Sequence, residues 1–208
     1  MKPLAALLVL LFLMALHAQE RVACIGDSIT YGSGLEGRES NSYPSVLQHL
    51  LGEKFEVKNF GASGATLLKK GDKPYWKEKV FKSATDLKPN IVVIKLGTND
   101  SKPQNRTNIT DFVTDLAAMV EHFSALETKP RIYLCLPVPV YRTQWGINED
   151  SVANEVIPAI RKVAAEKKLP VIDLHRALAN RQEMFPDGVH PNLAGARVIA
   201  ETVYASLR

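Results

Sequence analysis

The sequence has few cysteines, few aromatic residues and no block of charge of one sign. It holds two cysteines and two tryptophans among 208 residues, and aromatic residues make up 7% of the chain. Cys24 and Cys135 both lie in apolar runs of strand length, so we predict two separate buried thiols and a fold that relies on its core. The formal charge of +4 comes from interspersed acidic and basic residues, and we therefore expect no nucleic-acid partner.

Several common catalytic signatures are also absent. No G-x-S-x-G nucleophile elbow occurs, which disfavours the standard α/β-hydrolase arrangement. The stretch from Gly32 to Gly37 matches G-x-G-x-x-G in its letters, but it does not directly follow a strand-like run, so we expect no dinucleotide site. The turn "GDSITYGSG" lacks the Lys-Ser or Lys-Thr pair of a phosphate loop.

The first 18 residues differ in composition from the rest of the chain. They contain Lys2, an apolar stretch of 13 residues from Leu4 to Leu16, and the small residue Ala18, which is the plan of a secretory signal peptide. The apolar stretch is shorter than the ~20 residues that span a bilayer. We predict that residues 1–18 are a signal peptide and that residues 19–208 form one secreted or periplasmic domain, with no stable membrane partner after cleavage.

Short apolar runs alternate with helix-like segments along the rest of the chain. The runs, which are typical of strands buried on both faces, lie at residues 21–26, 55–61, 90–97, 131–137 and 169–174. The helix-like segments lie at residues 43–54, 76–85, 110–126, 149–168 and 192–207. Pro158 predicts a kink or a late start in the fourth of these segments. The alternation predicts an α/β fold, a three-layer α/β/α sandwich around a five-stranded parallel sheet.

Ligands of such sheets bind beyond the carboxyl ends of the strands, so the loops after the strands are the first candidates for a site. "GDSITYG" follows the first strand, and Ser28 lies within it. A serine hydroxyl is a poor nucleophile unless a base takes its proton and a third group orients that base. "DGVH" supplies both partners, because Asp187 and His190 are spaced so that the carboxylate reaches Nδ1 while Nε2 faces the serine. Taken singly, a turn cap and a surface histidine explain these two residues as well.

Attack on an ester also requires N–H donors for the negative charge that develops on the carbonyl oxygen. Asn99 in "GTND" can present a side-chain amide. Gly64 in "GASGAT" and Ser28 can present backbone N–H groups. A turn asparagine and a turn glycine are the structural alternatives for Asn99 and Gly64.

Together these blocks closely resemble the SGNH, or GDSL-type, hydrolase family, which is named for a Ser, a Gly, an Asn and a His in four separate blocks. Here they correspond to Ser28 in "GDSIT", Gly64 in "NFGASGAT", Asn99 in "GTND" and His190 in "DGVHP", in the family order. The resemblance covers essentially the whole mature chain. It implies a flavodoxin-like sandwich, ester hydrolysis without metal or other cofactor, and a triad of Ser28, His190 and Asp187.

The substrate is indicated by two further stretches. "WGINEDSVANEVIPAIRKVA" and "MFPDGVHPN" are similar to those of secreted carbohydrate O-acetylesterases, including sialate O-acetylesterase relatives, which implies an acetylated sugar or glycan as substrate. Small residues near Gly64 predict a short acyl pocket: Ala62, Ser63, Ala65 and Thr66. Four aromatic residues are candidates for a wall that binds the sugar, with core packing as the alternative for each: Tyr75, Trp76, Tyr141 and Trp145. A lipid or aryl esterase of lysophospholipase type, or an inert glycan-binding module, are the other functions open to this sequence.

Overall fold

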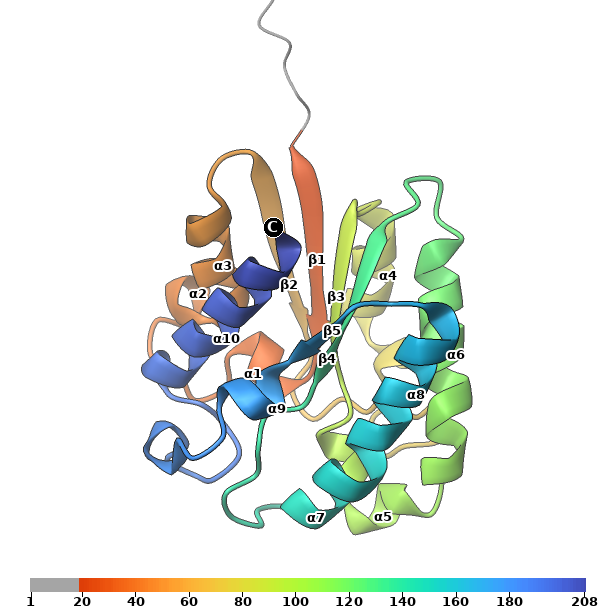
Figure 1. The fold of residues 1–208 in the computed structure, drawn as a ribbon, viewed down its shortest axis with the longest axis vertical. Coiled ribbons are helices and arrows are strands. Elements are labelled where there is room, and N and C mark those ends of the chain that lie inside the picture. The colour runs from red at the N-terminus through yellow and green to blue at the C-terminus, as the bar shows by residue number, and fades with distance from the viewer. Residues whose placement is uncertain (1–18) are drawn as a thin grey trace, which may run out of the picture.

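A computed structural model of the chain describes residues 19–208, and the predicted signal peptide lies outside them. The five predicted strands form one parallel sheet, in the order β2-β1-β3-β4-β5 (Figure 1). The strands are β1 (Glu20–Gly26), β2 (Phe55–Gly61), β3 (Ile91–Lys95), β4 (Arg131–Leu136) and β5 (Val171–Asp173).

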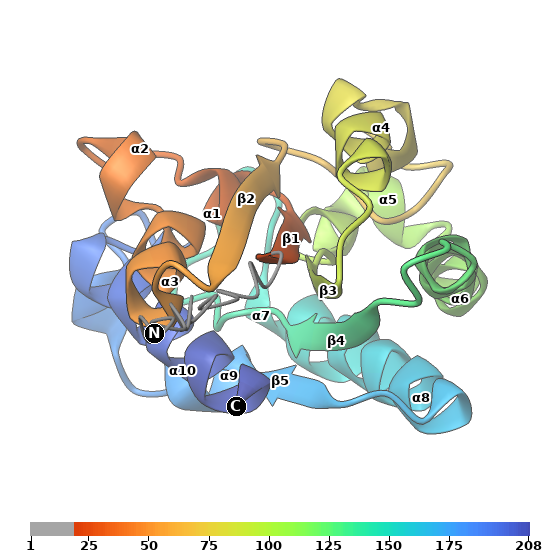
Figure 2. The same cartoon turned by 90° about the horizontal axis from the view of Figure 1, so that it is seen from above.

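Helices cover both faces of the sheet, which confirms the predicted three-layer sandwich. Figure 2 shows α3 and α10 on one side of the strands and α4, α6 and α8 on the other. The longer helices are α3 (Tyr43–Leu51), α4 (Lys79–Asp86), α6 (Phe112–Ser124), α8 (Ile157–Lys167) and α10 (Leu193–Leu207). The shorter ones are α1 (Ser28–Tyr31), α2 (Arg38–Asn41), α5 (Pro103–Arg106), α7 (Glu149–Ser151), α9 (Leu174–Ala177) and the single turns η1 (Tyr75–Lys77), η2 (Asn99–Ser101), η3 (Ile109–Asp111) and η5 (Gln182–Met184).

The central strands are apolar on both faces because each face carries its own core. In β1, Val22 and Cys24 pack in the cluster on the side of α3 and α10, whereas Ala23 and Ile25 pack in the cluster on the other side. Cys24 and Cys135 are both buried and free, and β3 lies between the strands that carry them. The prediction of two separate buried thiols is therefore confirmed.

Pro158 changes the helix in the segment 149–168, as predicted. Five residues of π-helix, η4 (Val152–Val156), precede α8, and Pro158 is the second residue of α8. Proline has no N–H to donate to the carbonyl four residues earlier, so the regular α-helical pattern is interrupted there.

The strand order places the site. From β1 the chain goes to β2 on one side, and from β3 it proceeds to β4 and β5 on the other, so the loops after β1 and β3 flank the switch point at which such sheets bind ligands. The helix α1 packs closely on the end of β2: a Cβ at Gly61 would lie 2.1 Å from the Tyr31 nitrogen, so only glycine fits. Within residues 19–208, no helix is both long and apolar enough to cross a membrane.

Candidate active site

The nucleophile candidate Ser28 begins the short helix α1, directly after β1. The side chain of Asp27 caps this helix, because Asp27 Oδ1 accepts a hydrogen bond of 3.0 Å from the Ile29 N–H. Gly32, with φ at +90°, ends the helix, and its N–H donates to the Ser28 carbonyl. Both ends of a single helical turn are thus fixed, and Ser28 Oγ is held at the carboxyl edge of the sheet.

Ser28, His190 and Asp187 form a continuous chain of contacts. Ser28 Oγ lies 2.8 Å from His190 Nε2, and His190 Nδ1 lies 2.7 Å from Asp187 Oδ2. Asp187 Oδ1 accepts two further bonds, from the N–H groups of Val189 at 2.8 Å and His190 at 2.7 Å. Burial raises the pKa of Asp187, but these backbone and ring hydrogen bonds outweigh burial and leave the pKa below its ordinary value.

The protonation of this chain follows from the carboxylate. An ionised Asp187 can only accept, so His190 Nδ1 carries the proton, and in a neutral ring Nε2 is then an acceptor. The Ser28 hydroxyl therefore donates to Nε2. In this arrangement His190 Nε2 can accept the proton of the serine hydroxyl.

Three candidate N–H donors belong to residues that line one cavity: Ser28, Gly64 and Asn99. Gly64 follows β2 with φ at +79°, in the left-handed region that favours glycine, and its N–H donates to no acceptor among the described residues. Asn99 is buried, and its Nδ2 donates to the Ala65 carbonyl at 3.1 Å, which orients the amide and leaves its second N–H for a ligand. The Ser28 N–H belongs to the first residue of α1 and has no acceptor within that helix.

A cavity of about 250 Å³ opens above these groups. It is lined by Ser28, Ser33, Ser63, Gly64, Asn99, Lys102, Trp145, Ile147 and His190. The volume is below the ~300–1,000 Å³ of pockets for drug-sized ligands, so the cavity suits a small acyl group together with part of its alcohol.

The model of the GDSL-like lipase/acylhydrolase family matches residues 24–198, a range that includes all four predicted blocks. The chain belongs to this family.

Proteins similar to this GDSL-family chain include esterases of several kinds. An acetylxylan esterase of Xylanibacter ruminicola is 41% identical over 206 residues, which cover 90% of this chain and 43% of the relative, so the chain spans less than half of that protein. Among solved structures, Est24, a carbohydrate acetylesterase from Sinorhizobium meliloti, matches with a TM-score of 0.76 and 15% identity over 91% of this chain and 98% of its own. The native M. smegmatis aryl esterase matches with a TM-score of 0.74 and 20% identity over 91% and 98%. At these identities the two structures show the shared fold.

Four aromatic residues were predicted to bind the sugar, and of these only Trp145 lines the cavity beside Ser28. Trp145 is 57% exposed, and its ring centroid lies 5.3 Å from that of His190. It is held in a tight turn in which Gln144 and Ile147 exchange two backbone hydrogen bonds, with φ at +51° for Trp145 and +81° for Gly146. Positive φ at both central residues is the geometry of a type I′ turn.

The structure does not bring Tyr75, Trp76 or Tyr141 to this cavity. Tyr75 is fully buried and donates its hydroxyl to the Phe60 carbonyl at 2.6 Å, and Trp76 is half-buried with its Nε1 donating to the Leu67 carbonyl at 2.8 Å. The hydroxyl of Tyr141 accepts from the Arg181 N–H at 2.8 Å. Each ring fills space next to the core and its polar atom has a backbone partner, so none of the three lines the cavity.

The small residues near Gly64 are placed only partly as predicted. Ala62, Ala65 and Thr66 are buried below the surface of the site, and only Ser63 lines the cavity. The Ser63 hydroxyl lies 2.7 Å from that of Ser33 across the cavity wall.

Sequence reasoning missed three residues of the cavity wall: Ser33, Lys102 and Ile147. Ser33 and Lys102 follow Ser28 and Asn99 closely in the chain, and that proximity is the signal that could have found them.

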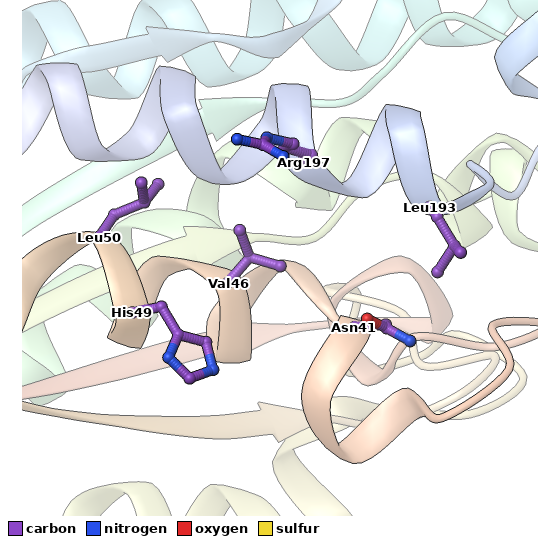
Figure 3. A pocket seen from close by; sticks show the side chains of 6 residues that line it. All are labelled: Asn41, Val46, His49, Leu50, Leu193 and Arg197. Atoms are coloured by element: carbon purple, nitrogen blue, oxygen red, sulfur yellow. The ribbon is translucent and has the colours of Figure 1, made fainter.

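A larger hollow of about 350 Å³ lies elsewhere on the surface. Its walls come from α2, α3 and α10, and Figure 3 shows Val46, Leu50 and Leu193 around it together with His49 and Arg197. It contains none of the residues of the triad or of the three N–H donors. Its size therefore gives no reason to move the candidate active site.

Proposed function

We propose that this protein is a serine esterase that removes O-acetyl groups from carbohydrates, with Ser28 as nucleophile, His190 as base and Asp187 as the group that orients the base. The observation that carries this proposal is the chain of contacts from Asp187 through His190 to Ser28, which ends at a cavity with three N–H donors. Nucleophile, base and oxyanion donors are the three parts that acyl transfer requires.

The reaction has two steps. Ser28 Oγ attacks the acetyl carbonyl while His190 Nε2 takes its proton, and the N–H groups of Ser28, Gly64 and Asn99 bind the oxyanion. The sugar oxygen leaves with the proton from His190, and an acetyl ester remains on Ser28. His190 then takes a proton from water, whose oxygen attacks this ester, and acetate is released while Ser28 regains its proton. Asp187 stabilises the imidazolium that forms in each step.

Two features support an acetylated carbohydrate over other esters. The cavity is small, and its exposed aromatic residue, Trp145, is placed beside His190 where the departing alcohol would lie. Aromatic faces suit the apolar face of a pyranose ring. The X. ruminicola relative named as an acetylxylan esterase supports an acetylated polysaccharide of the xylan type as the first substrate to test.

We also propose that the protein is exported. Residues 1–18 have the composition of a signal peptide, and cleavage would leave residues 19–208 as the mature domain. N-terminal sequencing of the protein recovered from the periplasm or the medium tests this, and a mature protein that begins at Met1 would contradict it.

Acetate release from acetylated xylan, measured with wild-type protein and Ser28→Ala, tests the function directly. A p-nitrophenyl ester series from two to eight carbons tests the acyl pocket. Each methylene buried in an apolar pocket contributes ~0.8 kcal/mol, so kcat/KM that rises towards eight carbons would instead support a lipid or aryl esterase. A serine-reactive phosphonate should add one adduct mass at Ser28, and an unmodified protein would support a glycan-binding module.

A further inference from the structure

A lysine is buried directly beneath the candidate site. Lys95 is the last residue of β3 and lies opposite Gly26 of β1 in the sheet register, next to the turn that carries Ser28. Its side chain is fully buried. The Lys95 ammonium contacts three oxygen atoms: Asp27 Oδ1 and Oδ2, each at 3.0 Å, and Thr98 Oγ1 at 2.9 Å. An ammonium has three N–H donors, so its hydrogen-bonding capacity is fully used.

Each partner of Lys95 stands immediately before a residue of the site. Asp27 precedes Ser28, and the same Oδ1 that binds Lys95 also caps α1 through the Ile29 N–H. Thr98 precedes Asn99, at the start of the turn η2. Lys95 therefore joins the turn after β1 to the turn after β3. These turns carry the candidate nucleophile Ser28 and the candidate oxyanion donor Asn99, which catalysis requires at a fixed separation.

Stability alone does not explain this ion pair. Removing two charges from water carries a large penalty, and well-packed apolar residues in place of a buried pair are often neutral or stabilising. A second carboxyl group, Asp100, is also fully buried, and burial raises its pKa to about 7, with a smaller contribution from the charge of Asp27. A polar pair retained in such surroundings specifies geometry, because its hydrogen bonds accept only a narrow range of positions.

We propose that Lys95 is a positioning residue that fixes Ser28 relative to Asn99 through its bonds to Asp27 and Thr98. The inference rests on the proposed esterase function and deepens it. Lys95 touches neither substrate nor reacting atoms in this proposal, so its loss should lower kcat while substrate binding persists. Misplacement of a catalytic group by about 1 Å reduces rates by ~10²-fold, which sets the size of the expected effect.

The main test uses the double variant Lys95→Met/Asp27→Asn. This variant removes both charges, and the amide oxygen introduced at position 27 can still cap α1. We expect a folded protein with kcat for p-nitrophenyl acetate lower by ~10²-fold and KM changed by less than about twofold. The rate at which a phosphonate modifies Ser28 should fall by the same factor. Wild-type kcat and labelling rate in the folded variant, or a change confined to KM, would overturn the proposal.

Thr98→Val provides a second variant if the double variant does not fold. It keeps the shape of the side chain and the Lys95–Asp27 pair, and it removes only the bond towards the Asn99 turn. We expect kcat about tenfold lower at unchanged KM. Wild-type kcat in Thr98→Val would overturn the role of Lys95 as a link between the two turns.

Asp115→Asn is the matched control. Asp115 is a buried carboxylate that accepts from the Lys69 N–H at 2.8 Å and lies 3.6 Å from Lys69 Nζ, and it does not line the cavity. We expect a lower Tm with kcat unchanged, and an equal loss of kcat in this control would overturn the proposal. A wild type that releases no acetate from any acetylated carbohydrate would refute the proposed function. Labelling of Ser28 uses no sugar, so the labelling rates would still decide the role of Lys95.

Discussion

Substituting Asp187 by Asn should be more harmful to activity than substituting it by Ala, although Asn is the closer mimic. The reason lies in the two oxygens of the carboxylate. Oδ1 accepts from the N–H groups of Val189 and His190, and Oδ2 faces His190 Nδ1. In Asp187→Asn the amide oxygen must take the place of Oδ1, because an NH₂ group there would oppose two N–H donors. The NH₂ group then faces Nδ1.

This orientation forces the wrong tautomer. An NH₂ donor at Nδ1 requires that nitrogen to be an acceptor, so the proton moves to Nε2, which then cannot accept the Ser28 proton. The expected loss in kcat is ~10⁴-fold. Asp187→Ala leaves the ring of His190 free to adopt either tautomer. The loss in kcat for Asp187→Ala should therefore be at least about tenfold smaller than the loss for Asp187→Asn. Asp187→Ala also loses the cap on two backbone N–H groups, which costs ~1–2 kcal/mol of stability.

The assay is kcat for p-nitrophenyl acetate with both variants, together with their Tm values. Asp187→Asn should keep a Tm close to that of wild type and lose more activity, whereas Asp187→Ala should unfold earlier and lose less. If Asp187→Asn proves more active than Asp187→Ala, then either the amide is not held by the two backbone donors or Asp187 does not set the tautomer of His190.

Three further predictions follow from the same geometry. Asn99→Ala should lower kcat by ~10²–10³-fold with KM nearly unchanged, measured on p-nitrophenyl acetate, and an effect on KM alone would mark a substrate-binding residue instead. Trp145→Asn should raise Tm slightly, because Asn tolerates positive φ, and should raise KM for acetylated xylo-oligosaccharides; an unchanged KM would remove Trp145 from the sugar site. The pKa of Asp100 is about 7 in the fold against about 4 in an unfolded chain, so its stabilising contribution is present below about pH 4 and is lost as pH rises to 7. Tm measured across that window should therefore fall less steeply in Asp100→Asn than in wild type, and parallel curves would contradict the raised pKa.

The sheet and the residues at its edge could be predicted from the sequence for one physical reason. Strands buried on both faces must be apolar throughout, so their ends are marked by the first Gly, Pro or polar residue. Ser28, Gly64 and Asn99 follow three such ends, and parallel strands bring their carboxyl ends to one edge. Asp187 and His190 are only three residues apart, so their contact depends on one turn rather than on the whole fold.

Which loop side chains face the cavity and which pack inward could not be predicted in the same way. Tyr75, Trp76, Tyr141 and Trp145 are chemically alike, yet only Trp145 lines the cavity, and the polar atoms of the other three bond to backbone groups. Whether an aromatic ring turns inward depends on the space that the folded chain leaves beside it, which for Tyr75 and Trp76 is next to the carbonyls of Phe60 and Leu67 that accept their hydrogen bonds. A single sequence contains no record of that space.

Lys95 could not be predicted for a related reason. In the sequence it interrupts an apolar strand, and a charged residue at the end of a strand is ordinarily solvated. Only the sheet order reveals that β3 lies beside β1. This neighbourhood brings the Lys95 ammonium at the end of β3 within hydrogen-bond distance of the Asp27 carboxylate, which directly follows β1. The pair depends on two residues that are 68 positions apart in the chain.

The backbone strain at Trp145 distinguishes this residue from the buried aromatic residues. A bulky residue with positive φ is uncommon, and holding a residue in such a region costs on the order of 1–3 kcal/mol. Tyr75 fills the core and donates a hydrogen bond, so burial and bonding explain its presence. Trp145 is 57% exposed and in a strained turn, so neither burial nor backbone preference explains a tryptophan there. The proposed sugar site beside His190 would give the exposed ring a role. The dipeptide Trp-Gly, in which glycine occupies the second left-handed position of the turn, is the signal in the sequence that could have distinguished Trp145 from the other three.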